Sequence, residues 1–398
     1  MQWTRRSFMA ASGAALAAAQ TRPDYQLQLD TLSQGFDGET CWVHPRAGIV
    51  PGERGPAVVL TMQKLLLTGS DVFYALNELR TDDLGRTWQG PRERQTELGR
   101  REEAGGVVAA LCDFTPQWHR KSSTLLGIGH VARYVNNRLM PAPRPVDSAF
   151  SIYDAGQPSW TPWRVIETPA AHRHLRFSAG CAQRVDLDDG EILQPVSFGD
   201  GKGPNQVAVA RCSFDGETLR VRELGRPLSV NVERGLVEPS LTRFGKRYFL
   251  TLRNDVKGYA AEGDGLQFSA PRPWCFDDGA ELGNYNTQQH WVAHSAGLYL
   301  VYTRRGANND HVFRHRAPLF LARVDPERLC VLRATERAVV PERGARLGNF
   351  GVTTVNREET WITVSEWMQP RGCEKYGSDN SVYAARLRWR RPNELAER

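Results

Sequence analysis

Residues Arg80–Pro91 read Arg-Thr-Asp-Asp-Leu-Gly-Arg-Thr-Trp-Gln-Gly-Pro, and this stretch decides the fold. Five of these residues match the pattern Ser/Thr-x-Asp-x-Gly-x-Thr-Trp, known as an Asp-box: Thr81, Asp83, Gly85, Thr87 and Trp88. The Asp carboxylate can accept hydrogen bonds from N–H groups of its own turn, the Gly can take a positive φ, and the Trp can pack under a hairpin. Such a hairpin joins the outer two strands of a β-propeller blade, so the stretch predicts a propeller.

The rest of the chain also predicts an all-β fold. After the N-terminal segment there is no long helix-periodic stretch, and short apolar or alternating runs are separated by Gly, Asp, Pro and Asn. These runs are Ala57–Met62, Val72–Leu76, Thr124–Ile128, Ala149–Tyr153, Val207–Arg211, Tyr248–Leu252, Leu298–Tyr302, Leu319–Val324, Trp361–Ser365 and Val382–Arg388. We expect one closed unit, because an open sheet with this many strands would leave long unpaired edges.

Weak internal repetition sets the expected number of blades. Degenerate relatives of the Asp-box occur at Ser213–Leu219, Gly263–Phe268 and Ser151–Gly156. Together with the apolar runs they define six units of roughly 45–55 residues, the size of a four-stranded blade. The units are 40–90, 105–165, 175–225, 232–275, 284–330 and 343–390. We therefore predict a six-bladed β-propeller of four-stranded antiparallel blades, with seven blades as the alternative and the strand Ser381–Arg388 helping to close the ring.

The N-terminal segment has the features of an export signal. Thr4–Met9 reads Thr-Arg-Arg-Ser-Phe-Met, a twin-arginine signature, and the weakly apolar Ala10–Ala19 ends in an Ala-Ala-Ala cleavage site. The apolar stretch is too short to span a bilayer of about 30 Å. We predict a twin-arginine signal peptide over residues 1–19, a single domain over residues 20–398 and no membrane anchor. Export by this route places a folded protein in the periplasm or outside the cell.

Charge and cysteine content narrow the function classes. The net charge of +6 is spread along the chain without Lys/Arg runs, so we expect no nucleic-acid partner. The seven cysteines are scattered without a C-x-x-C pair, which argues against a disulfide framework or a zinc site. We expect no metal, no cofactor and a monomer.

The order of motifs resembles the sialidase superfamily over most of the chain. His44–Pro51 is similar to the family's Arg-Ile-Pro stretch, Asp71 follows it, and the Asp-box comes next. Gly180–Pro195 resembles the family's third-blade pattern, and Glu238-Pro239 leading to a strand that ends at Arg253 resembles the fourth. Arg316 stands where a fifth-blade arginine belongs.

The resemblance implies an exo-acting glycoside hydrolase that takes an anionic carbohydrate, such as a sialic or uronic acid. Arg46, Arg253 and Arg316 would bind the substrate carboxylate through paired N–H donors. Asp71 would be the acid/base, and Glu238 would activate a nucleophilic tyrosine.

One departure from the family leaves the reaction open. Asn349 and Phe350 stand where that tyrosine belongs, and neither is a nucleophile. Tyr285 is the candidate replacement. Polar residues near Trp and Arg suggest a further set of catalytic or binding groups: His119, His130, Tyr134, Gln289 and His290. A His or Tyr that removes a proton beside an Arg-bound uronate is typical of propeller lyases, so a polysaccharide lyase is one alternative and a non-catalytic glycan-binding propeller is another.

Overall fold

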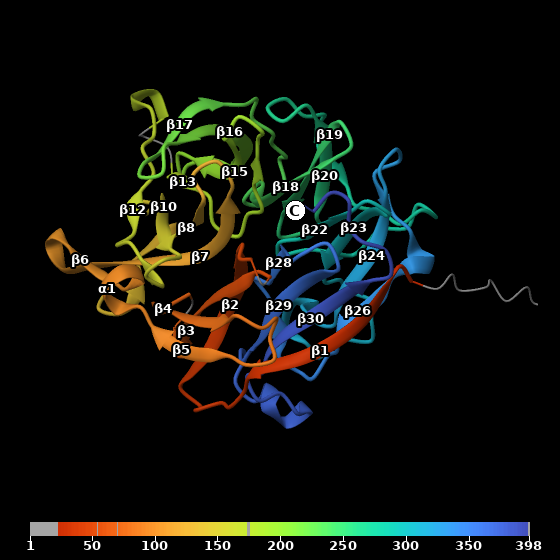
Figure 1. The fold of residues 1–398 in the computed structure, drawn as a ribbon, viewed down its shortest axis with the longest axis horizontal. Coiled ribbons are helices and arrows are strands. Elements are labelled where there is room, and N and C mark those ends of the chain that lie inside the picture. The colour runs from red at the N-terminus through yellow and green to blue at the C-terminus, as the bar shows by residue number, and fades with distance from the viewer. Residues whose placement is uncertain (1–22, 54, 70, 173–175, 397–398) are drawn as a thin grey trace, which may run out of the picture.

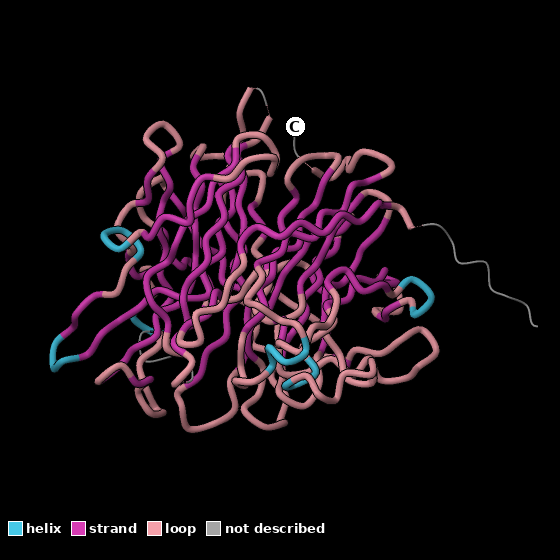
Figure 2. The backbone as a smooth tube through the Cα atoms, turned by 90° about the horizontal axis from the view of Figure 1, so that it is seen from below, coloured by secondary structure: helices cyan, strands magenta, loops and turns pink. Residues whose placement is uncertain are grey.

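The computed structural model describes residues 23–53, 55–69, 71–172 and 176–396, and within these ranges the chain is an all-β propeller of antiparallel sheets (Figure 1). The predicted signal segment and its cleavage site lie outside the described residues. Helices in the described part are short turns in the segments between strands: α1 (Gln95–Leu98), η1 (Ala104–Gly106), η2 (Ala170–His172), η3 (Phe313–His315), η4 (Arg333–Thr335) and η5 (Cys373–Tyr376) (Figure 2). None of them is long and apolar enough to cross a membrane.

The described strands form six sheets, which follow one another along the chain. The first contains β2 (Thr40–Val50), β3 (Ala57–Leu66), β4 (Phe73–Thr81) and β5 (Gln89–Glu93). The second contains β6 (Arg101–Glu103), β7 (Val107–His119), β8 (Thr124–Val135), β9 (Arg138–Leu139), β10 (Asp147–Asp154), β11 (Ser159–Trp160) and β12 (Arg164–Val165). The third contains β13 (Arg176–Ser178), β14 (Val185–Asp186), β15 (Ile192–Gly199), β16 (Gln206–Phe214) and β17 (Leu219–Leu224).

The second half of the chain supplies the other three sheets. The fourth contains β18 (Val237–Phe244), β19 (Arg247–Arg253), β20 (Tyr259–Gly263) and β21 (Arg272–Pro273). The fifth contains β22 (His290–His294), β23 (Gly297–Tyr302), β24 (Leu319–Asp325), β25 (Cys330–Val331) and β26 (Arg337–Val340). The sixth contains β27 (Arg346–Leu347), β28 (Gly351–Thr354), β29 (Glu359–Trp367), β30 (Val382–Trp389) and β1 (Tyr25–Ser33).

The strand count per sheet differs from the uniform four that we predicted. Among the described residues two sheets have four strands, three have five and one has seven. The excess consists of short strands such as β9, β12 and β26, which pair beside a longer neighbour within the same sheet. Beside these additions, five of the six described sheets keep a path of four paired strands, and the second has a path of five, from β11 to β6.

The ring closes through both ends of the described chain. β1 pairs antiparallel with β30, with Tyr25 opposite Trp389, so the first strand is the outer strand of the last sheet (Figure 1). Inner strands of consecutive sheets contact each other, and β2 contacts both β7 and β28. Apolar clusters fill the spaces between neighbouring sheets; one of them joins Leu126 and Phe150 to Val196 and Ala208. The core is therefore a set of apolar interfaces between sheets that follow one another around a ring.

The Asp-box turn, which contains Asp83, Gly85 and Thr87, connects β4 to β5. The Asp83 carboxylate accepts hydrogen bonds from the Thr87 backbone N (2.9 Å) and the Thr87 hydroxyl (2.7 Å), and Gly85 has a φ of 81°. Equivalent turns in four other sheets also have an Asp that accepts from backbone N–H groups two or three residues later: Asp154, Asp215, Asp264 and Asp325. The same local chemistry thus recurs at the same place in the sheet.

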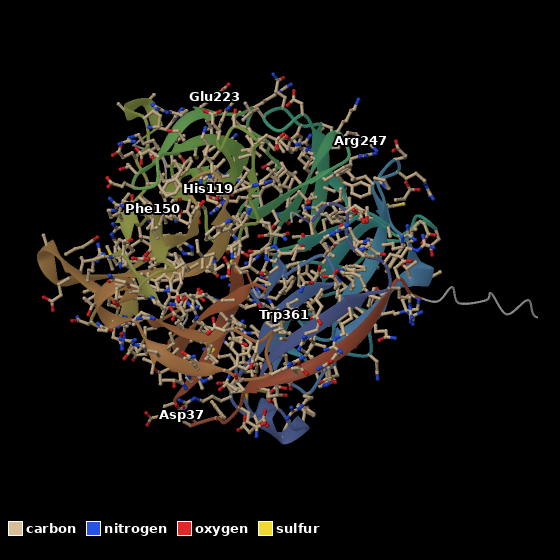
Figure 3. The ribbon with its side chains drawn as sticks, viewed as in Figure 1. Asp37, His119, Phe150, Glu223, Arg247 and Trp361 are labelled. Atoms are coloured by element: carbon tan, nitrogen blue, oxygen red, sulfur yellow. The ribbon has the colours of Figure 1, made fainter. Side chains whose placement is uncertain are left out.

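Trp88 is less buried than we expected. It is partly exposed and lies 6.1 Å, between ring centroids, from Trp361, which is 1% exposed. Trp361 comes from β29, so the tryptophan in the apolar space between the first and sixth sheets belongs to the neighbouring sheet (Figure 3). All seven cysteines are free thiols, and all except the partly buried Cys275 are buried.

Candidate functional site

A charged pocket of about 430 Å³ lies where loops and strand ends of the sheets converge. Its ionisable lining residues are Asp71, Asp113, His130, Arg144, Arg234, Glu238, Arg253, Asp255, Arg314, Arg316 and Arg346. Six arginines therefore face four carboxylates, which gives the pocket an excess of positive charge. We take this pocket as the candidate site, because it combines convergent charged groups with a concave shape.

The backbone near this pocket repeats one unusual conformation. In each sheet a non-glycine residue with a φ between 45° and 59° lies in the innermost strand or in the loop beside it: His44, Asp113, Cys181, Glu238, Asn286 and Asn349. In β2, β7 and β18 this residue sits in a register shift of the sheet. Side chains in this backbone region are uncommon and concentrate at functional sites. The bulges turn these side chains out of the alternating strand pattern and bring them together.

Arg253 is neutralised within the pocket. Its guanidinium is ion-paired with the Glu238 carboxylate and lies 3.4 Å from Asp255. Burial lowers the pKa of Arg253, but the neighbouring Glu238 outweighs it and the pKa is raised. The second oxygen of Glu238, Oε2, is buried without a hydrogen-bond partner. Arg253 and Glu238 thus form a fixed ion pair in which the second carboxylate oxygen is buried and unbonded.

Arg316 and Arg346, unlike Arg253, are not neutralised by an ion pair among the described residues. They are 2% and 5% exposed, and among the described residues neither forms an ion pair with a carboxylate. Arg316 donates to the backbone carbonyl of Asn286, while Arg346 donates to Gln369 Oε1 (2.6 Å) and stacks on Trp367. The Nε atom of each arginine is buried without a partner.

The pKa values of Arg316 and Arg346 are both lowered, as expected for buried cations without an ion-pair partner. Burial, reinforced by Arg253 and Arg346, holds the pKa of Arg316 well below its usual range. Burial and then Arg314 lower the pKa of Arg346 to about 10, although the charge of Asp71 raises it. Two buried cations that form no ion pair with a described carboxylate have the charge and the hydrogen-bond donors that suit an anion.

Asp113 is the centre of a buried polar network at one side of the pocket. Its Oδ1 accepts from Arg46 (3.1 Å) and from the amide of Asn349 (3.0 Å), and it lies 3.3 Å from His44 Nδ1. The Asn349 amide also donates to His44 Nε2 (2.9 Å), so the His44 proton is on Nδ1. Burial lowers the pKa of His44 to about 4, which keeps this ring neutral near pH 7.

The structure places five of the predicted site residues in the pocket lining: Asp71, His130, Glu238, Arg253 and Arg316. Arg46 lies just behind it, 1% exposed, where it binds Asp113 and Cys181 Sγ (3.2 Å). We predicted that Arg46 binds substrate, but the structure makes it the counter-ion of Asp113. Asn349 lines the pocket and Phe350 is completely buried behind it.

The remaining predicted residues lie outside the lining. Tyr134 is buried, and its hydroxyl donates to the Asp71 carbonyl (2.8 Å) and accepts from Phe73 N (3.1 Å), so it positions the Asp71 loop. Tyr285 is partly buried and pairs with His315 Nδ1 (2.5 Å). Neither hydroxyl faces the pocket that holds the arginines.

The other three are buried structural residues. His119 bonds to Ser122 Oγ (2.7 Å) and to the Gly190 carbonyl (2.9 Å), which ties the second sheet to the third (Figure 3). Gln289 bonds to Thr251 (2.8 Å) and His290 to Ser240 (2.6 Å). Burial lowers the pKa of His290 to about 3, so this ring stays neutral.

The sequence reasoning missed Asp113 and Arg346. One signal for Asp113 was available, because it is a carboxylate that interrupts the apolar run Val107–Phe114. Arg346 comes three residues before Asn349, and nothing in its sequence context distinguishes it from the other arginines.

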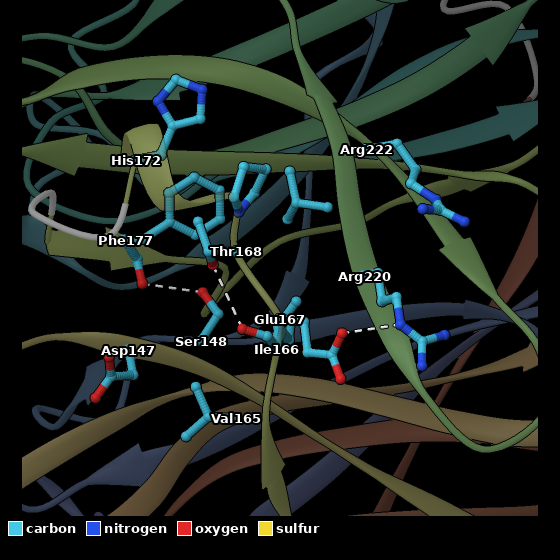
Figure 4. Close-up of a pocket in the computed structure, with 12 residues that line it drawn as sticks. Asp147, Ser148, Val165, Ile166, Glu167, Thr168, His172, Phe177, Arg220 and Arg222 are labelled. Carbon is cyan, nitrogen blue, oxygen red and sulfur yellow. Dashed lines mark hydrogen bonds and ion pairs between the residues drawn. The ribbon is translucent and has the colours of Figure 1, made fainter.

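A larger hollow of about 600 Å³ lies elsewhere on the surface, between the second and third sheets (Figure 4). Two of its charged residues are paired with each other, since Arg220 donates to Glu167 (2.8 Å). Ser148 is bonded to the Phe177 carbonyl (3.0 Å). This hollow has the larger volume, but the charged pocket gathers the unbonded buried atoms of Glu238, Arg316 and Arg346, so we place the chemistry in the charged pocket, called the central pocket below.

One group among the described residues has the composition of a metal site. Cys112, Asp113 and His130 place one ligand atom each within 4.8 Å of one another, and Cys112 Sγ lies 3.2 Å from His130 Nε2. The Arg46 guanidinium already holds Asp113 at 3.1 Å, and a cation at that distance opposes the binding of another. The cluster is better described as part of the Asp113 network.

No family model and no curated protein matches the chain. Solved structures do match: a protein of unknown function from Dyadobacter fermentans has a TM-score of 0.59 and 16% identity, over 91% of this chain and 99% of that one. Trypanosoma rangeli sialidase with the inhibitor DANA has a TM-score of 0.59 and 13% identity, over 87% of this chain and 55% of that one. The NanB sialidase of Streptococcus pneumoniae has a TM-score of 0.59 and 10% identity, over 90% of this chain and 70% of that one. The chain thus spans about half of the length of the trypanosomal enzyme. At these identities the likeness concerns the fold, and the chain has a sialidase-like β-propeller fold.

Proposed function

We propose that this protein is an exported carbohydrate-active enzyme, an exo-acting glycoside hydrolase that takes a sugar with an anionic group. The observation that carries the proposal is the pair of buried, uncompensated guanidiniums of Arg316 and Arg346 in the pocket that also holds Asp71 and Glu238. An anion bound there receives charge-assisted hydrogen bonds and removes the electrostatic cost of two buried cations.

The fold comparison supports a carbohydrate as the partner. Trypanosoma rangeli sialidase is described in complex with sialic acid, at 13% identity and a TM-score of 0.56 to this chain. In our proposal Arg316 and Arg346 hold the acid group of the sugar, Asp71 serves as the acid/base, and the Arg253–Glu238 pair binds hydroxyl groups. Glycosidic hydrolysis needs a proton donor at the leaving oxygen, and Asp71 is a carboxyl that lines the pocket.

A polysaccharide lyase is the second candidate function, and the position of one residue, His130, supports it. Of the three His and Tyr candidates for proton abstraction, His119, His130 and Tyr134, His130 lines the pocket. A lyase releases an unsaturated uronate that absorbs in the ultraviolet, whereas a hydrolase does not. The activity assay therefore separates the two readings directly.

The cellular setting is part of the same proposal. We propose that each of the six sheets is one blade, that the first 19 residues direct export by the twin-arginine route, and that the mature monomer acts in the periplasm or outside the cell. Fractionation of cells expressing the full chain tests the export. An Arg5→Lys/Arg6→Lys variant should stay in the cytoplasm, and a secreted double variant would contradict the route.

Binding of monosaccharides tests the central claim. Calorimetry with glucuronate, galacturonate and N-acetylneuraminate should show binding of at least one acid and none of neutral glucose. Arg316→Gln should weaken that binding by about 10–150-fold, since one charge-assisted hydrogen-bond donor is lost. The matched control Arg222→Gln, in the outer hollow, should bind like the wild type. Equal affinity of wild type and Arg316→Gln would refute the proposal.

A further inference from the structure

Asp113 has the setting of a carboxylate that reacts. It is 6% exposed, lies in the bulge of β7, and lines both the central pocket and an adjoining hollow of about 150 Å³. Arg46 and Asn349 fix its Oδ1 through donors at 3.1 and 3.0 Å. Its Oδ2 lies 3.8 Å from His130 Nδ1, beyond hydrogen-bond distance. One oxygen is therefore immobilised and the other is held less tightly.

The same neighbours keep Asp113 ionised. Burial raises the pKa of a carboxyl, but the charge of the Arg46 guanidinium overcomes that effect and the pKa of Asp113 lies well below its usual range. A group that never takes up a proton near pH 7 cannot be the general acid. It can attack an electrophilic carbon or stabilise a positive one.

Asp71 and Asp113 therefore differ in their surroundings. Asp71 is half-buried in a loop whose backbone carbonyl accepts from the Tyr134 hydroxyl, and the Asp113 carboxylate lies in a strand bulge, where it accepts from Arg46 and Asn349. Retaining glycosidases pair one carboxyl that carries a proton with one that is permanently charged. Asp71 and Asp113 both line this pocket.

We propose that Asp113 is the nucleophile of a retaining glycoside hydrolysis in this pocket, an inference that rests on the proposed function. Asp113 Oδ2 forms a bond to the anomeric carbon while the bond from that carbon to the leaving oxygen breaks, and Asp71 gives its proton to that oxygen. Water then gives a proton to Asp71 and attacks the anomeric carbon. The ester bond to Asp113 breaks, and both carboxyls return to their starting states.

This assignment selects the substrate class. In a sialic acid the carboxylate is attached to the anomeric carbon itself, so it would meet the charged Asp113 at bonding distance, where like charges repel strongly. In a hexuronic acid the carboxylate is on C5, and the ring oxygen separates it from the anomeric carbon. With Asp113 as the nucleophile and Arg316 and Arg346 as the anion receptor, the substrate is a hexuronoside.

Covalent trapping on the wild-type protein tests the nucleophile. The probes are 5-fluoro-glucuronosyl fluoride and its galacturonosyl epimer, each as the α and the β anomer. We expect one of them to inactivate the protein and to add one fluoro-uronosyl group to the tryptic peptide 102–120, on Asp113. A label on Tyr285 or Glu238, or no label from a protein that turns over a uronide, would overturn the inference.

Two further measurements separate a reacting role from a structural one. Asp113→Gly should lower turnover of methylumbelliferyl uronides by at least about 1,000-fold, and azide should restore part of it as a glycosyl azide of the opposite anomeric configuration. The control Glu167→Gln, in the outer hollow, should keep wild-type turnover. A variant that azide does not rescue, with an unlabelled wild type, would assign Asp113 a structural role.

The substrate class has its own readout. Wild-type protein should cleave a uronide at least ten times faster than methylumbelliferyl N-acetylneuraminide and release the product with retained configuration in proton NMR spectra. Faster cleavage of the neuraminide would overturn the inference while leaving the proposed hydrolase intact. Failure to bind any of these acids would instead refute the proposed function, and the inference with it.

Discussion

Replacing Arg346 with methionine should stabilise the free protein and weaken its ligand binding at the same time. The buried guanidinium has a pKa lowered from 12.5 to about 10. That difference corresponds to about 3 kcal/mol of native-state cost at pH 7, because the charged form is disfavoured only in the folded state. The lost hydrogen bond to Gln369 subtracts about 1 kcal/mol, and the lost stacking on Trp367 about another.

The sum leaves a gain of about 1 kcal/mol for Arg346→Met, which urea unfolding can detect. The sign also appears in the pH profile. The unfolded wild type holds the Arg346 proton up to a higher pH than the folded state, so folding stability should rise with pH between about 10 and 12.5, and the variant should lack that rise. Affinity for the bound acid should fall by about 10–150-fold.

The control for this prediction is Arg222→Met, on the exposed side of the outer hollow, which should change stability by less than about 0.5 kcal/mol. If Arg346→Met destabilised the protein by more than 1 kcal/mol and left acid binding unchanged, the arginine would be a packing residue, and the electrostatic reasoning would be wrong.

Two further predictions concern stability. Trp361→Ala should cost about 3–5 kcal/mol in urea unfolding, since the ring is 1% exposed, whereas Trp88→Ala should cost clearly less because that ring is partly exposed; equal losses would contradict this assignment. His290 has a pKa lowered from 6.5 to about 3, so its contribution is complete above pH 6.5 and is lost as the pH falls from 6.5 towards 3, when the unfolded state takes up a proton that the folded state refuses. His290→Gln should flatten the acid limb of the stability profile in this range, and an unchanged slope would show that His290 does not titrate as described.

The sheet boundaries were predictable, and the direction of the site residues was only partly so. Turn residues such as Asp215 and Asp264 mark the hairpins in the sequence because their side chains accept from their own backbone. The bulge at Asp113, by contrast, reverses the alternation of β7 at a single residue, and no residue type announces that change. Arg46 shows the limit clearly. Its type and position suit an anion receptor, but its guanidinium donates to Asp113 (3.1 Å) and is not part of the pocket lining.

The environment of each arginine differs in ways that its place in a motif does not predict. Arg253 forms an ion pair with Glu238, fifteen residues earlier in the chain. Arg316 instead donates a hydrogen bond to the backbone carbonyl of Asn286. Such differences depend on side chains from several sheets at once. The sequence pattern can therefore nominate Arg316, but the missing counter-ion is visible only in three dimensions.

The pairing of β1 with β30 has a consequence for synthesis. About 350 residues separate the two strands, so at bacterial elongation rates β1 waits roughly 20–70 s on the ribosome before its partner emerges. During that time it is a nine-residue strand with an unsatisfied edge and exposed leucines at 27 and 29. Completion of the ring is thus an event at the end of translation, and any truncation that removes β30 also releases the first strand of the chain.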